Sequence, residues 1–222
     1  MTIQEMHLLF KFLTNTVGNQ SYVSFEPEEI DLSINQYIRT FIKQRYGGLN
    51  IHKTGFEDTQ KRIDDLRTLV SNSSLILNSD PINGKPNSVV ADLPENYWFS
   101  VHEEAVCTVG NCPSKRIPIV ARTHDEYNDF INNPYQMPNK RKCIRVMRGN
   151  FIEVFHGANV VINSVIMRYI RKPQEVSLAN DIDCDLSEQA HEEIVKGAAM
   201  FAMQLIGDNR NRPLTDFTQI QE

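Results

Sequence analysis

The sequence has few of the motifs that mark an enzyme. Its 222 residues contain no GxSxG elbow, no HExxH pair, no glycine-rich phosphate loop and no paired carboxylates in a recognisable frame. The six histidines have no obvious catalytic partner in the sequence. Catalytic groups can also be assembled in space from distant positions, but nothing in the sequence argues for catalysis. We predict a protein that is not an enzyme and that needs no cofactor.

Long apolar runs and secretory signals are also missing. No apolar run approaches the roughly 18 residues that a membrane-spanning helix needs, and Glu5 stands where a signal peptide carries positive charge. We therefore expect no membrane partner and no secretory route. The four cysteines are then expected to be reduced, in a cytoplasm or in a particle assembled there. The formal net charge of -5 gives no global attraction to nucleic acid.

One alternative function is that of a small intracellular metal-dependent hydrolase. His102, Cys107, Cys112 and Cys143 are the residues that could form a Cys₃His zinc site. Against this site, the spacing contains no CxxC pair, and an odd separation along a strand would turn His102 and Cys107 to opposite faces. The other interpretation is that the thiols are small buried groups. Zinc analysis of the purified protein distinguishes the two.

Apolar periodicity predicts helices near both ends of the chain. Thr2 and Glu5 match a capping box at the start of the first helix, and Pro27 suits the first turn of the second. Gly47 and Gly48 end that second helix. The predicted helices cover about 3–17, 27–46, 56–70 and 187–206.

The middle of the chain has a different character. From about residue 75 to 173, turn signals alternate with runs rich in β-branched and aromatic residues, which predicts an antiparallel sheet joined by hairpins. A short helix is predicted in "HDEYNDFIN". The predicted fold class is α+β, with N- and C-terminal helices forming a helical bundle and an antiparallel β-rich subdomain inserted between them. The expected parts are 1–75, 76–180 and 181–222, with the helical parts packing as one domain.

The stretch "DIDCDLSEQAHEEIV" (181–195) carries six acidic residues and no basic one. Asp181, Asp183 and Asp185 alternate like calcium ligands, but the glycine that an EF-hand needs at its sixth position is missing. The spacing is also typical of a helix start, with Asp185 or the nearby serine as the cap and Glu188 completing a box. We therefore interpret the acidic block as capping and predict no metal.

A basic cluster lies in "NKRKCIRVMR" (139–148). Its cationic residues are Lys140, Arg141, Lys142, Arg145 and Arg148. Three interpretations remain open: a solvated loop and strand edge, a surface that pairs with another protein, or a patch that faces phosphate. A DNA-binding regulator with "IDLSINQYIRTFIKQRYGG" as its recognition helix fits less well, because the broad apolar stripe of that helix indicates burial.

Five stretches carry a family resemblance. They are "TIQEMHLLFKFLTN", "DLPENYWF", "HDEYNDFINNPYQMP", "YIRKPQEVSLAN" and "DLSEQAHEEIVKGAAMFAMQLIGD", in this order. Together they resemble the head-to-tail connector proteins, or ring and adaptor proteins, of crAss-like Bacteroides tailed phages. The resemblance spans nearly the whole chain. One departure is Ser187, where the resemblance leads us to expect proline, but serine also starts helices.

The resemblance implies a structural virion protein without catalysis. It implies a connector ring or adaptor below the portal that joins capsid to tail and lines or surrounds the DNA channel. The implied partners are further copies of itself in a ring of about twelve, the portal protein, other tail or ring proteins, and non-specific DNA in the channel. The implied location is the neck or tail of the virion, after assembly in the host cytoplasm.

Head-to-tail packing in a ring brings two different faces together, and the charged segments offer such faces. We hypothesise that the basic cluster meets the acidic block of another subunit or ring. The basic side would be Lys140, Arg141, Lys142 and Arg145, and the acidic side Asp181, Asp183, Asp185 and Glu188.

The polar tail after the last predicted helix contains three apolar residues at intervals of three, namely Leu214, Phe217 and Ile220. A tail that buries no apolar groups on its own domain often docks elsewhere. We predict that it docks on the portal or on a neighbouring ring; the other interpretation is a frayed terminus.

Overall fold

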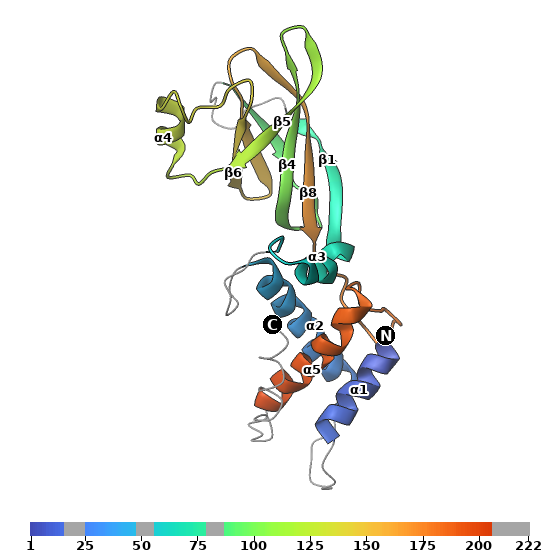
Figure 1. Ribbon diagram of the computed structural model, residues 1–222. Helices are drawn as coiled ribbons and strands as arrows, with labels where there is room; N and C mark the ends of the chain where they lie inside the picture. Colours follow the sequence, from blue (N-terminus) through green and yellow to red (C-terminus); the bar gives the residue numbers. More distant parts are fainter. Residues whose placement is uncertain (16–24, 48–55, 79–86, 206–222) are drawn as a thin grey trace. The chain divides into compact units, whose positions relative to one another are not determined.

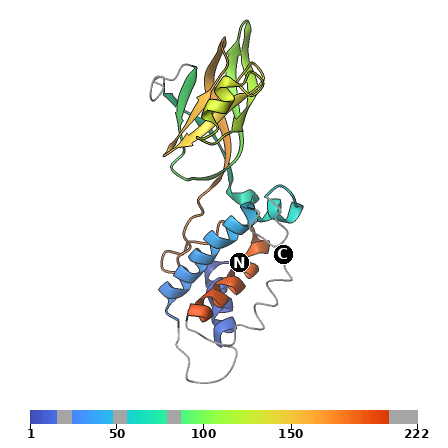
Figure 2. The same cartoon turned by 90° about the vertical axis from the view of Figure 1, so that its left-hand side faces the viewer.

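The computed structural model describes residues 1–15, 25–47, 56–78 and 87–205 (Figures 1 and 2). The chain divides into two compact units. One consists of Met1–Leu69 and Pro173–Glu222, and the other of Val70–Lys172. We call them the helical unit and the sheet unit. Together they give a mixed α+β structure, the predicted fold class in its coarse form.

Four of the α-helices belong to the helical unit: α1 (Ile3–Asn15), α2 (Pro27–Tyr46), α3 (Gln60–Leu66) and α5 (Glu188–Leu205), with a 3₁₀ turn, η1 (Arg67–Leu69), after α3. Helix α5 contacts both α1 and α2, and α3 contacts α2. The apolar stripes predicted from the sequence form the core between them. In α2, for example, Ile30, Ile34 and Ile38 are buried, as are Phe41 and Ile42.

Two helix starts follow the signals in the sequence. In α1, Glu5 N donates to Thr2 Oγ1 over 3.3 Å, and Thr2 N donates to Glu5 Oε2 over 3.0 Å. This is the predicted capping box. Helix α2 begins at Pro27, whose missing N–H costs nothing in the first turn. Glu26 N donates to Glu29 Oε2 over 3.0 Å, which further satisfies that end of the helix.

A buried arginine joins three elements of the helical unit. Arg45 Nε of α2 lies 3.1 Å from Asp65 Oδ2 of α3, and Arg45 Nη2 lies 2.6 Å from Glu193 Oε1 of α5. Lys61 Nζ approaches Glu193 Oε2 at 3.9 Å. Burial raises the pKa of the Asp65 and Glu193 carboxyls, and the positive charge of Arg45 opposes this effect. Two poorly hydrated carboxylates thus share one guanidinium.

Eight strands form one sheet in the described residues of the sheet unit. They are β1 (Val70–Leu75), β2 (Leu77–Asn78), β3 (Ser88–Asp92), β4 (Tyr97–Val109), β5 (Cys112–Ala121), β6 (Cys143–Arg148), β7 (Phe151–Phe155) and β8 (Val160–Arg171). Their order is β1-β8-β4-β5-β6-β7-β3-β2. The sheet curls, and β2 also contacts β8. Helix α4 (Tyr127–Asn132) lies beside the strands in Figure 1.

Contacts cross the interior of the curled sheet between β4 and β6, which have β5 between them in the strand order. Glu103 Oε2 lies 2.5 Å from Arg145 Nε, and both side chains are buried. At one end of this row, Tyr97 donates its hydroxyl hydrogen to Met147 Sδ over 3.9 Å. At the other end, the buried thiols of β4 and β6 share a hydrogen bond. This hydrogen bond lowers the pKa of Cys107 on β4. The same hydrogen bond and burial both raise the pKa of Cys143 on β6.

Three details differ from the sequence-based expectations. The third helix is shorter than predicted, because it ends at Leu66 and a 3₁₀ turn follows. Val70–Leu75, whose first residue was expected to end that helix, forms the edge strand β1, which pairs with β8. The sheet is not wholly antiparallel, because β5 and β6 run parallel, with Ile119 opposite Cys143.

The shared arginine leads to a test of stability. Replacing Arg45 by Leu leaves two buried carboxylates without their common cation, so we expect the free energy of unfolding to fall by about 3–5 kcal/mol. Arg39→Leu is the matched control on the same helix, because Arg39 is 57% exposed in its pair with Glu175, and we expect a loss of no more than about 1 kcal/mol. Urea unfolding followed by circular dichroism at 222 nm measures both. Equal losses would contradict the role given to Arg45.

Candidate interaction surfaces

The acidic block ties the last helix of the helical unit to the first. Asp183 Oδ1 accepts a hydrogen bond from Ile3 N over 2.7 Å, so it satisfies an amide in the first turn of α1. Asp185 Oδ2 accepts from Gln174 N over 3.0 Å. Glu188 Oε1 lies 3.3 Å from the Met1 ammonium. These carboxylates therefore already contact groups of their own unit.

Of the other acidic residues in the block, two pair within their own unit and one is exposed. Helix α5 begins at Glu188, directly after Ser187. Glu192 pairs with Lys196 at 2.7 Å, and Glu193 belongs to the Arg45 cluster. Asp181 is exposed, at a positive φ of 52°. His191 Nε2 donates to Leu186 O over 2.9 Å, so the backbone of its own unit satisfies this buried side chain.

The structure separates the basic cluster into a surface part and an interior part. Lys140 and Arg141 are exposed and Lys142 is half-buried. Arg145 is buried and paired with Glu103. Its inclusion in a surface contact is therefore corrected: Arg145 shares a face of β6 with Cys143, and that face looks into the sheet unit.

The surface part of the cluster forms a tight turn. Asn139 Oδ1 accepts hydrogen bonds from Arg141 N over 2.8 Å and from Lys142 N over 3.1 Å. Asn139 N donates to Lys142 O over 2.9 Å. Gly157 makes room for this turn, because a Cβ at that position would lie 2.9 Å from Asn139 Cα. The two exposed cations are thus presented by an ordered backbone.

The turn belongs to a longer connection, residues 122–142 between β5 and β6, which we call the arm. Its helix α4 buries Phe130 against Ile144, Val146 and Phe155, a second small core beside the main one. Tyr127 packs edge-on to Phe130 with ring centroids 5.4 Å apart. These contacts hold the arm on β6, on the face opposite Arg145.

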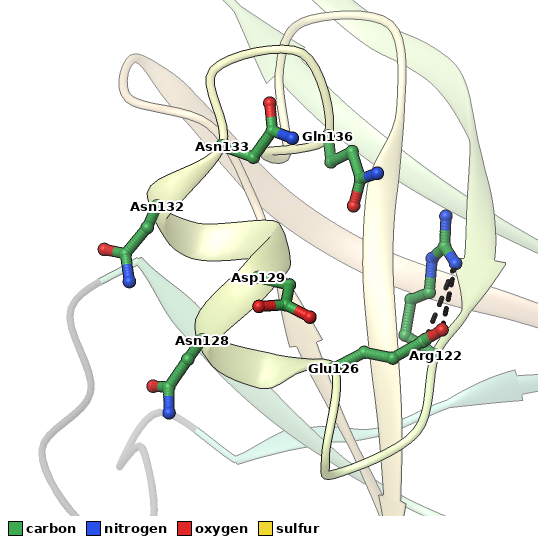
Figure 3. A pocket seen from close by; sticks show the side chains of 7 residues that line it. All are labelled: Arg122, Glu126, Asn128, Asp129, Asn132, Asn133 and Gln136. Carbon is green, nitrogen blue, oxygen red and sulfur yellow. Dashed lines mark hydrogen bonds and ion pairs between the residues drawn. The ribbon is translucent and has the colours of Figure 1, made fainter.

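One side of the arm carries a polar groove of about 580 Å³ (Figure 3). Its lining residues are Arg122, Glu126, Asn128, Asp129, Asn132, Asn133 and Gln136. Arg122 Nη1 lies 3.4 Å from Glu126 Oε1, and in Figure 3 the Asp129 carboxylate is on the side of α4 that faces this pair. The groove has side-chain donors and acceptors but no apolar wall, so it suits a hydrated polar contact better than an apolar ligand.

The helical unit has a smaller and more apolar groove between α2 and α5, with a volume of about 230 Å³. Its lining residues are Gln36, Tyr37, Thr40, Gly197, Met200, Phe201 and Gln204. Gly197 allows the Tyr37 ring to lie against the α5 backbone, because a Cβ at 197 would be 1.9 Å from Tyr37 Cζ. Neither groove was predicted from the sequence; the run of amides in 128–136 was the available signal for the polar one.

The four residues that could form the zinc site differ in how deeply they are buried. Cys107 and Cys143 are buried, whereas Cys112 is exposed. His102 is half exposed and hydrogen-bonded to Glu104 Oε1 at 3.1 Å, on the opposite face of β4 from Cys107. In the described ranges, no three or more His, Cys, Asp or Glu side chains are grouped to hold a metal ion. No helix in those ranges is long and apolar enough to cross a membrane.

The two units differ in charge. The helical unit has 11 basic and 19 acidic residues, a formal charge of -8, and the sheet unit has 12 basic and 9 acidic residues, a formal charge of +3. The net charge of -5 therefore conceals two parts of opposite sign. The predicted docking residues Leu214, Phe217 and Ile220 lie outside the described residues.

Comparison with protein families identifies a class of virion structural proteins. The chain belongs to the family described as phage tail ring protein 3/4, whose family model matches residues 1–211. This match confirms the resemblance to ring proteins of crAss-like phages. No curated protein matches the chain. The family name indicates a structural role in the virion and oligomeric assembly with other phage tail proteins.

The anchoring of the arm leads to a second test. Phe130→Ala leaves a cavity between α4 and β6, and we expect the sheet unit to lose about 3–5 kcal/mol of free energy of unfolding. The neighbouring Ile131→Ala is the control, because Ile131 is 38% exposed while Phe130 is 1% exposed; we expect it to change stability by less than about 1 kcal/mol. Fluorescence of Trp98, the single tryptophan, follows unfolding of this unit. A similar loss in both variants would show that Phe130 does not anchor the arm.

Proposed function

We propose that this tail ring protein is a head–tail connector: a ring or adaptor below the portal that joins capsid to tail and surrounds the DNA channel. About twelve copies would form the ring, with the portal and other ring or tail proteins as partners and with DNA in the channel as a non-specific contact. Assembly would take place in the host cytoplasm. The observation that carries this proposal is the family match over residues 1–211.

The charge division supports a head-to-tail ring. A heterologous interface joins two different faces of the same protein, and charge complementarity between them favours correct pairing. The unit charges of -8 and +3 offer that complementarity. We propose that Lys140, Arg141 and Lys142 of one copy face the acidic helical unit of the next, in the region of the acidic block that includes exposed Asp181.

A charge reversal tests this contact. We expect the triple variant Lys140→Glu, Arg141→Glu and Lys142→Glu to assemble only at about tenfold higher protein concentration, because attraction becomes repulsion. Salt should weaken assembly of the native protein but not that of the variant, because screening then acts on a repulsion. Arg67→Glu, at a residue whose side chain is 68% exposed in the helical unit, is the control. Light scattering across a salt series measures both properties, and unchanged values in the triple variant would refute the contact.

The C-terminal tail is proposed to dock on the portal or on a neighbouring ring. Its three apolar residues would then be buried on the partner, which is a common use of an apolar tail. We expect deletion of residues 213–222 to abolish co-assembly with the portal and to leave the circular dichroism spectrum and the thermal midpoint unchanged. Particle imaging of the protein mixed with its portal measures co-assembly. Portal complexes formed by the truncated chain would disprove the docking role.

A further inference from the structure

The arm displays one aromatic side chain far into solvent. Tyr135 is 89% exposed, and no large apolar side chain in the described ranges is more exposed. Its backbone is nevertheless held on both sides: Tyr135 N donates to Asn133 Oδ1 over 3.0 Å, and Lys142 Nζ donates to Tyr135 O over 3.1 Å. An exposed ring on an ordered backbone loses little conformational freedom when it is buried by a partner.

The α2–α5 groove has the size and chemistry to take such a ring. Its volume of about 230 Å³ lies below the roughly 300–1,000 Å³ of pockets that hold small-molecule ligands. Tyr37, Met200 and Phe201 supply apolar contact, and the side chains of Gln36, Thr40 and Gln204 supply polar groups around it. Tyrosine needs this combination, since its ring is apolar and its hydroxyl requires a hydrogen-bond partner when buried.

We propose that Tyr135 of one copy inserts into the α2–α5 groove of a second copy. This inference rests on the proposed ring function and names a central contact of its interface. Tyr135 lies on the unit with charge +3 and the groove on the unit with charge -8, so the contact joins two units of opposite net charge. Exposed Lys140 and Arg141 lie on the same arm as Tyr135. An aromatic anchor within a charged rim is the usual anatomy of a protein interface.

Two variants test the contact from its two sides. Tyr135→Ser removes the anchor, and Gln36→Trp fills the groove from an exposed position of α2. We expect each to raise the protein concentration needed for half-maximal assembly by about 10- to 100-fold. The controls are Ile76→Ser, at a residue 77% exposed in the sheet unit, and Leu8→Trp, at a residue 72% exposed on α1. Mass photometry over a concentration series gives the readout, and circular dichroism checks that each variant is folded.

Crosslinking identifies the partner surface directly. A photoreactive benzoylphenylalanine in place of Tyr135 should crosslink to peptides from 36–40 or 197–204. Mixing ¹⁵N-labelled and unlabelled full-length protein shows whether the joined peptides come from two copies. Crosslinks to other peptides, or only within one copy, would overturn the inference.

The outcomes separate this inference from the proposed function. Native protein that assembles while Tyr135→Ser and Gln36→Trp assemble equally well refutes the contact and leaves the ring function standing. Native protein that stays monomeric, alone and with its portal, refutes the ring function and the contact together. Loss of assembly in both test variants but in neither control, with crosslinks between copies, supports the contact.

Discussion

The parallel pairing of β5 with β6 is the constraint on which the sheet unit depends. Antiparallel neighbours can be joined by a tight hairpin, but parallel neighbours need a connection that crosses back to the start of the next strand. Residues 122–142 make that connection, and in doing so they lay α4 over one face of β6. Strand β6 is therefore covered twice: Ile144 and Val146 meet the arm, while Cys143 and Arg145 face the interior. Tyr135 lies within this connection, where Asn133 and Lys142 hold its backbone.

The helical unit depends on contacts that its acidic residues make. Asp183 satisfies an amide at the start of α1, and Glu193 and Asp65 share Arg45 between three elements. A surplus of carboxylates thus has a structural use, and the cost of placing two of them in a poorly hydrated site is reduced by a common cation. The surplus also leaves this unit with a formal charge of -8, which is the charge that the proposed contact with a basic surface uses.

Local signals were sufficient to predict most elements. The capping box at Thr2, the proline at 27 and the strands β6 and β7 follow from spacing within about ten residues, where periodicity and turn chemistry are informative. Val70–Leu75 was misassigned because its first apolar residue continues the helical spacing of Leu66. The burial of Arg145 could not be predicted, since its partner Glu103 lies in a distant strand. The same limit applies to both grooves, which are made by packing between elements or by the fold of the arm.

The family resemblance and the residue patterns contributed different parts of the result. The quoted motifs identified the class of protein, which the family match confirms. They gave no information about which surfaces are exposed. The structure added that information: it divided the basic cluster into a buried arginine and an exposed turn, and it showed that three of the acids named for a subunit contact are engaged within their own unit. The residues that the fold leaves exposed, among them Lys140, Arg141 and Tyr135, are the ones available for assembly contacts.

The row of contacts between β4 and β6 has an evolutionary consequence. Glu103 and Arg145 lie in different strands, yet a change at one alone leaves a buried charge without its partner. Selection therefore acts on the two codons as one unit, and viable relatives should keep both charges or replace both with a neutral pair. The row therefore offers few single-step routes for change.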